Sequence, residues 1–94
     1  MEILLKEDGS KGFAMAREND QHAGKMTYSI AGAELIIIDH TEVEPVHNGK
    51  GVGKLMLYKI VEMAREKNIK IIPLCPFAAT MFKKSGDIKD VLKA

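Results

Sequence analysis

Two segments in the first half of the chain, KGFAMARE and KMTYSIAG, alternate hydrophobic and polar residues with the period of two that marks β-strands, and EILLKED precedes them as another extended segment. ELIIIDHTEV, which follows, is instead apolar on both faces and rich in β-branched residues, which is typical of a central strand covered on both sides. The connections are short, so we expect an antiparallel meander. The four predicted strands are residues 2–8, 11–18, 25–32 and 34–43, with a turn over residues 19–24.

The apolar residues of the next segment take up helical spacing. Between Gly51 and Lys67 they recur at the i, i+3, i+4 positions of one buried helix face, and Asn68 is a suitable helix stop. The residues on that face are Gly53, Met56, Leu57, Ile60 and Ala64.

The rest of the chain predicts one more strand and two short helices. Residues 69–77 read as a second buried strand, far enough from the preceding strand for a helical crossover. Residues 77–86 suit a helix that ends at Gly86, and residues 87–94 suit another helix capped by Asp87. The order β-β-β-β-α-β-α-α predicts an α+β fold, in which helices pack on a mixed, mostly antiparallel sheet.

Composition sets limits on function. With 94 residues, the chain predicts a single domain, residues 1–94. A net charge of +1 gives no argument for a nucleic acid or membrane partner. The first residues resemble neither a signal nor a transit peptide, and no apolar run is long enough to span a bilayer, so a cytoplasmic location is expected. One cysteine excludes an internal disulfide and a cysteine-cluster metal site, and no metal is expected.

The residues before the long helix make an unfavourable helix start. Gly49, Gly51 and Gly53 stabilise a first turn poorly, and Lys50 and Lys54 add positive charge where the helix dipole is already positive. A flexible turn with close packing of helix on strand explains the glycines but not the lysines. A bound phosphate or pyrophosphate explains both, because free N–H groups, dipole and lysines would all act on the anion. The segment therefore predicts an anion site.

Spacing excludes the two common nucleotide-binding loops. A Walker loop would need glycine in place of Asn48 and a hydroxyl in place of Leu55. A dinucleotide fingerprint that begins at Gly49 would need glycine in place of Lys54. The anion site must therefore belong to another class.

VEPVHNGKGVGK resembles the loop of the GNAT acyltransferase superfamily, hydrophobic-x-P-x-x-R-G-x-G-[IV]-G-[KR]. AATMFKKSGD is similar to a later motif of the same superfamily, A-x-x-[LM]-Y-x-K-x-G-[FD]. HTEV and PLCPF resemble a small single-domain branch of N-acetyltransferase-like proteins, which lacks the usual helices between the first two strands. The motifs together cover residues 40–87, about half of the chain.

The resemblance implies that acetyl-coenzyme A binds where two central parallel strands splay apart. Its pyrophosphate would lie on the backbone from Asn48 to Lys54, although asparagine replaces the usual glutamine or arginine and gives less reach. Its pantetheine arm would pair with the strand end at Glu42 and Val43, and an N–H near Val43 would stabilise the oxyanion. The complete predicted set is Val43, Asn48, Gly49, Lys50, Gly51, Val52, Gly53 and Lys54.

Acetylation of an amine needs a base for the amine and an acid for the leaving thiolate. The tyrosine that supplies the acid in many family members is replaced by Phe82. His40 and Glu42 share a strand face about 7 Å apart, so Glu42 could be the base and His40 base or acid. Both could equally make structural hydrogen bonds. Cys75 could protonate the thiolate, carry the acetyl group, or simply fill the core.

The leading hypothesis is an acetyl-coenzyme A-dependent N-acetyltransferase that acts on a primary amine of a small molecule or a protein. The alternative is a non-catalytic acyl-coenzyme A-binding or sensing module, which Phe82 and Asn48 favour. A plain protein-interaction domain explains neither the glycine loop nor its lysines. A monomer and a homodimer that covers an open sheet edge are both compatible with the sequence. His22 and His47 are expected to be exposed turn residues, with a place at the mouth of the cofactor site as the alternative for His47.

Overall fold

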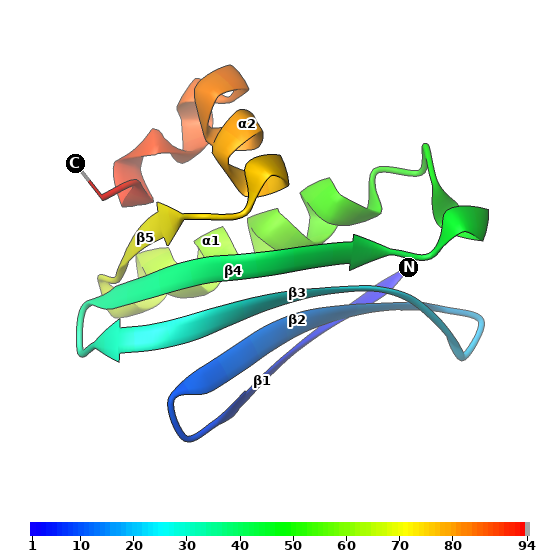
Figure 1. Cartoon of the computed structure of the whole chain (residues 1–94), viewed down its shortest axis with the longest axis horizontal. Helices are drawn as coiled ribbons and strands as arrows, with labels where there is room; N and C mark the ends of the chain where they lie inside the picture. The colour runs from blue at the N-terminus through cyan, green and yellow to red at the C-terminus, as the bar shows by residue number, and fades with distance from the viewer. Residues whose placement is uncertain (94) are drawn as a thin grey trace.

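A computed structural model describes residues 1–93 and contains one five-stranded sheet with the order β1-β2-β3-β4-β5 (Figure 1). Neighbouring strands are antiparallel except for β4 and β5, which are parallel. The predicted α+β fold is confirmed. The elements are β1 (Glu2–Asp8), β2 (Lys11–Glu18), β3 (Gln21–Gly32), β4 (Leu35–Val43), the 3₁₀-helix η1 (Pro45–His47), α1 (Val52–Lys67), β5 (Lys70–Pro73), α2 (Pro76–Lys84) and the 3₁₀-helix η2 (Gly86–Val91).

Two tight hairpins join the first three strands. Gly9 and Ser10 form the first turn, as predicted. The second turn is only Asn19 and Asp20, both with positive φ, a conformation that these two residue types tolerate well. The predicted turn over residues 19–24 is therefore too long, because β3 begins directly after Asp20.

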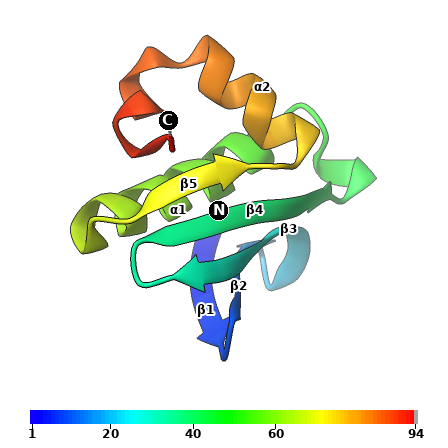
Figure 2. The same cartoon turned by 60° about the vertical axis from the view of Figure 1, so that its left-hand side comes forward.

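The long helix α1 packs its apolar stripe on the sheet (Figure 2). It contacts β1, β2, β3 and β4, and Asn68 ends it in the left-handed conformation with φ of 57°. Both the helix stop and the buried face are confirmed. The predicted face residues Gly53, Met56, Leu57, Ile60 and Ala64 are all buried.

Only one face of the sheet is covered by helices of the described chain (Figures 1 and 2). In β4, Ile36 and Ile38 on the α1 side are fully buried, whereas Ile37 on the other side is only half-buried. The prediction that this strand is covered on both sides is therefore wrong. The apolar sequence of β4 reflects its position between β3 and β5 in the sheet, and not cover by a helical layer on each face.

The C-terminal third departs most from the predicted boundaries. β5 ends at Pro73, because the amides of Leu74 and Cys75 both donate to the Ile38 carbonyl oxygen, at 3.1 Å each, and the ladder stops there. The segment after α2 is a 3₁₀-helix that Asp87 does not cap; its carboxylate instead accepts from the Tyr58 hydroxyl at 3.1 Å. Among residues 1–93, no helix is long and apolar enough to cross a membrane.

Candidate functional site

A β-bulge in β4 decides which side chains face which side of the sheet. Tyr28 pairs with Ile38 and Thr27 pairs with His40, so Asp39 is an extra residue in β4. Without it, His40 would continue the α1-facing row that contains Ile38. With it, the row continues through Thr41 and Val43, whereas His40 and Glu42 turn to the bare face of the sheet.

Beyond the bulge, β4 has a free edge on the side of β5. The last paired residues are Ile38 and Pro73, so residues 39–43 have no β5 partner. The Glu44 amide donates to Ala23 in β3, and alternation along the strand directs the Val43 amide the other way, towards this gap. Two strands that pair at one end and separate at the other make the splay that the resemblance implies.

A pocket of about 340 Å³ opens at this place, between the end of β4, the start of α1 and α2. Seven of the eight predicted cofactor residues line it, and Lys50 is the exception. Phe77 and Met81 of α2 add an apolar wall that the sequence analysis did not assign. Their i, i+4 spacing indicates that the two side chains share one face of a helix, but only the fold shows that this face is directed towards α1. The lining residues are Val43, His47, Asn48, Gly49, Gly51, Val52, Gly53, Lys54, Phe77 and Met81.

The start of α1 leaves its amides free of side-chain caps. Gly51 is the N-cap with φ of 75°, makes no side-chain capping bond, and is followed by no acid in the first turn. Gly49 also has a positive φ, of 83°, which favours glycine in this loop. Gly53 has a different reason: a Cβ there would lie 2.6 Å from the Phe77 ring. Two glycines therefore shape the loop before α1, and the third lets α2 approach.

The two lysines of the loop have different surroundings. Lys50 donates to Glu18 at 3.1 Å and lies 3.3 Å from the His47 Nδ1 atom, so its charge is held by the β2–β3 hairpin. This hydrogen bond and the charge of Lys50 lower the pKa of Glu18. Lys54 lines the pocket, with its ammonium 5.5 Å from the centre of the Tyr58 ring. Of the two, Lys54 is the better placed for an anion.

His47 departs from the main expectation for it, which was an exposed turn residue. It is only 5% exposed, and it lines the pocket, in agreement with the alternative that it lies at the mouth of the cofactor site. Its Nδ1 atom lies 3.4 Å from Glu18 Oε2, and its Nε2 atom is buried without a hydrogen-bond partner among the described residues. The His47 imidazole lies beneath the loop and contacts Glu18 of β2. No local sequence pattern indicates this contact.

Cys75 lies at the N-terminus of α2, where its backbone is the N-cap. Its sulfur accepts from the Ala78 amide at 3.3 Å and lies 3.1 Å from the Thr41 hydroxyl oxygen. The residue is 3% exposed. The thiol therefore bridges the separating ends of β4 and β5, beside a helix start that favours negative charge.

His40 and Glu42 form a separate group on the bare face. Their side chains are 68% and 70% exposed, and His40 Nε2 lies 3.9 Å from Glu42 Oε1. The structure thus brings the two together, as their strand spacing predicts, but the Cys75 sulfur contacts Thr41 instead. Within the part of the chain that the structure describes, no three His, Cys, Asp or Glu side chains gather as a metal site.

Residues 12–91 match the family model described as GCN5-related N-acetyl-transferase. No curated protein matches the sequence. Among solved structures, a GCN5-like protein from Staphylococcus aureus is 37% identical over 97% of this chain and 88% of its own, with a TM-score of 0.71.

Two more distant structures share the fold. A ribosomal-protein-alanine N-acetyltransferase from Brucella melitensis biovar Abortus 2308 is 18% identical, with a TM-score of 0.69, and covers 93% of this chain. A predicted acetyltransferase from Clostridium acetobutylicum, crystallised with acetyl-CoA, is 24% identical, with a TM-score of 0.63, and covers 80%. This chain spans only 64% and 56% of these two proteins.

Proposed function

Because this chain belongs to the GCN5-related N-acetyltransferase family, we propose that it transfers an acetyl group from acetyl-coenzyme A to a primary amine of a small molecule or a protein. The observation that carries the proposal is the pocket between the free edge of β4 and the uncapped start of α1, with the Cys75 thiol at the strand separation. A cytoplasmic location is proposed with it.

The residues around the pocket suit a ligand that combines an anion with an extended amide chain. The amides from Gly51 to Lys54 and the Lys54 ammonium would hold the diphosphate. The edge of β4 at Val43 would pair with the pantetheine amides, against Phe77 and Met81. When bound, acetyl-coenzyme A supplies the activated acetyl group.

Proton transfers are divided between the two faces of the sheet. An amine that approaches from the bare face meets Glu42 and His40 first, and the Glu42 carboxylate would take its proton directly or through water. Cys75 lies at the strand separation and would either release its Sγ proton to the departing sulfur or carry the acetyl group. The backbone N–H of Val43 would stabilise the oxyanion.

Binding of acetyl-coenzyme A should stabilise the fold. At 100 times the Kd, the ligand adds about 2.7 kcal/mol to the free energy of unfolding, which raises the Tm of a domain of this size by roughly 10–20 °C. Lys54→Ala should raise the Kd about tenfold, because it removes a charge-assisted hydrogen bond. Differential scanning fluorimetry measures the change in Tm, and isothermal titration calorimetry measures the Kd. Lys59→Ala, further along α1, is the matched control; an unchanged Tm with saturating ligand would overturn the proposal.

The base can be identified by comparing two substitutions on the bare face. Glu42→Gln should lower kcat about 100-fold, at the lower end of the usual range for loss of general base catalysis, whereas His40→Gln should lower it less than threefold. Both variants should bind acetyl-coenzyme A normally. Thiol release measured with a panel of amines reports the rates. A larger loss of kcat in His40→Gln than in Glu42→Gln would assign the base to His40. If neither substitution lowered kcat, neither residue would be the base.

One observation favours a second candidate, a non-catalytic acyl-coenzyme A-binding module. Phe82 is 2% exposed and fills the core beneath α2, so the position of the family's usual acid carries no proton here. Normal binding together with no thiol release for any amine would favour this module.

A further inference from the structure

The outer edge strand β1 is regular and uncovered along its length. It forms seven successive pairs with β2 without a bulge or a proline, and no strand of the described chain pairs with its other side. Ile3, Leu4 and Leu5 at its centre are only half-buried. Free edges with these properties tend to pair with another strand. The net charge of only +1 adds little repulsion between copies.

The hydrogen-bonding direction of each β1 residue follows from the hairpin. Asp8 and Lys11 flank the two-residue turn and form a hydrogen-bonded pair. Alternation then directs the backbone groups of Leu4 towards β2 and those of Ile3 and Leu5 towards the free edge. Ile3 and Leu5 are therefore the residues whose amides and carbonyls can accept a new strand.

We infer that β1 pairs antiparallel with β1 of a second copy, about a two-fold axis at Leu4. In this register Ile3 exchanges backbone hydrogen bonds with Leu5 of the second copy, and Leu4 faces its own counterpart. Glu2 and Lys6 then face each other twice, in the pairs where side chains approach most closely. Residues 2–6 therefore each oppose a residue of matching character.

The neighbouring registers lack this complementarity. Directly paired residues must share a sheet face, so the register can shift only in steps of two. One shift places Glu2 opposite Asp8 and Ile3 opposite Glu7, which sets like charges and then an apolar residue against a carboxylate. The other shift places Glu2 opposite Leu4 and leaves Lys6 without a partner.

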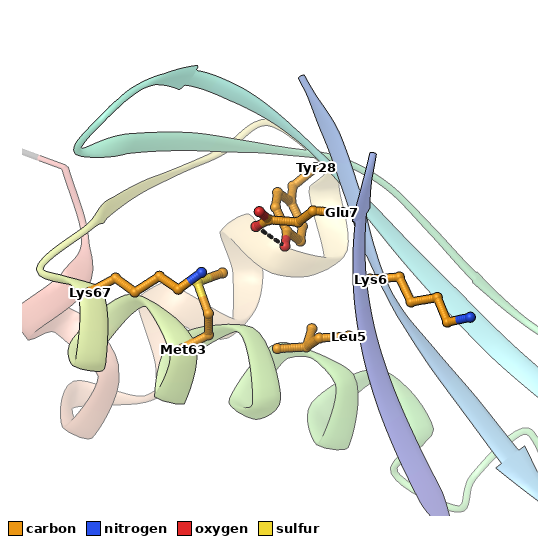
Figure 3. Close-up of a pocket in the computed structure, with 6 residues that line it drawn as sticks. All are labelled: Leu5, Lys6, Glu7, Tyr28, Met63 and Lys67. Carbon is orange, nitrogen blue, oxygen red and sulfur yellow. Dashed lines mark hydrogen bonds between the residues drawn. The ribbon is translucent and has the colours of Figure 1, made fainter. Parts of the chain in front are cut away.

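A pocket beside β1 supports the same arrangement (Figure 3). Its volume is about 270 Å³, and Leu5 and Glu7 project into it from β1 towards Met63 of α1, whereas Lys6 projects from the other side of the strand. Ile3 of the second copy would lie next to Leu5 on the same sheet face, where it would cover the apolar part of this pocket. The pocket proposed for acetyl-coenzyme A is lined by the end of β4, the start of α1 and α2, and no residue of β1 lines it, so the new strand pair involves none of its lining.

Charge reversal tests the register directly. We expect a dimer with a Kd on the order of 10–100 µM in sedimentation velocity, because the interface is small. Glu2→Lys and Lys6→Glu should each raise the Kd roughly tenfold, since each sets like charges opposite twice. The double variant should restore the wild-type Kd, and an equimolar mixture of the single variants should form the heterodimer preferentially.

Controls separate this interface from general charge effects and from the acetyltransferase proposal. Glu66→Lys and Lys83→Glu change the net charge equally on exposed helix positions and should leave the Kd unchanged. Acetyl-coenzyme A binding should be the same in all variants. In hydrogen exchange, the Ile3 and Leu5 amides should be protected more at high concentration. A monomer up to roughly 1 mM, or a dimer that the single reversals do not weaken, would overturn the inference.

Discussion

Cys75→Ala is expected to lower kcat for acetyl transfer by at least about 100-fold while the Kd for acetyl-coenzyme A stays within twofold. The sulfur is held by the Ala78 amide and lies against the Thr41 hydroxyl at the point where β4 and β5 separate. It is the only thiol in the chain, and Phe82 stands where the motif that this segment resembles has a tyrosine. Steady-state thiol release and calorimetry measure the two quantities.

A second measurement distinguishes the two chemical roles of Cys75. Intact-protein and peptide mass spectrometry after incubation with acetyl-coenzyme A, without an amine, would find an acetyl group on Cys75 if it carries the group. Its absence in an active enzyme would assign the thiol to proton transfer. Ser85→Ala at the other end of α2 is the control for general damage to the helix. Full turnover by Cys75→Ala would show that the thiol is structural.

Gly12→Val is expected to lower the free energy of unfolding by about 3 kcal/mol and the Tm by roughly 10–20 °C. Gly12 pairs with Tyr28 across β2 and β3, and a Cβ at Gly12 would lie 2.6 Å from the Tyr28 hydroxyl oxygen. The Tyr28 ring cannot move aside easily, because Tyr28 is fully buried and its hydroxyl donates to Glu7 at 2.7 Å. Burial and the Glu7 carboxylate raise the pKa of Tyr28, so the hydroxyl keeps its proton for this bond.

Urea and thermal unfolding followed by circular dichroism check this loss. Gly32→Val at the end of β3 is the matched control: no atom lies within 4 Å of a Cβ there, and the expected change is below about 0.5 kcal/mol. Combining Gly12→Val with Tyr28→Ala should cost less than the sum of the two single changes, because the clash disappears. Equal stability of Gly12→Val and wild type would contradict the packing explanation.

The prediction of the fold succeeded where local patterns were strong. Alternation at period two placed β2 and most of β3, the β-branched apolar run placed β4, and the stripe through Met56 and Ile60 placed α1. Boundaries failed where a single contact ended an element: the Ile38 carbonyl stops β5, and the contact between Tyr58 and Asp87 replaces the predicted cap. Such contacts join residues far apart in the chain, so no window of sequence contains them.

The glycine loop shows how one pattern can have two causes. Its sequence indicated an anion site, placed Gly53 also on the buried face of the helix, and assigned no separate roles to the two lysines. The structure separates them, because Gly53 makes room for Phe77 and Lys50 is held by Glu18. His47, expected in solvent, is buried beneath the loop. These neighbours come from β2 and α2, which only folding brings to the loop.

The sequence by itself determined the strand and helix order, the buried face of α1 and the family, because each depends on residue types at fixed local spacing. Only the tertiary structure decided which side of the sheet each candidate side chain faces. The extra residue Asp39 turns Glu42 to the bare face and Val43 to the pocket. A bulge is a mismatch between two strands, so it exists only once β3 and β4 are paired.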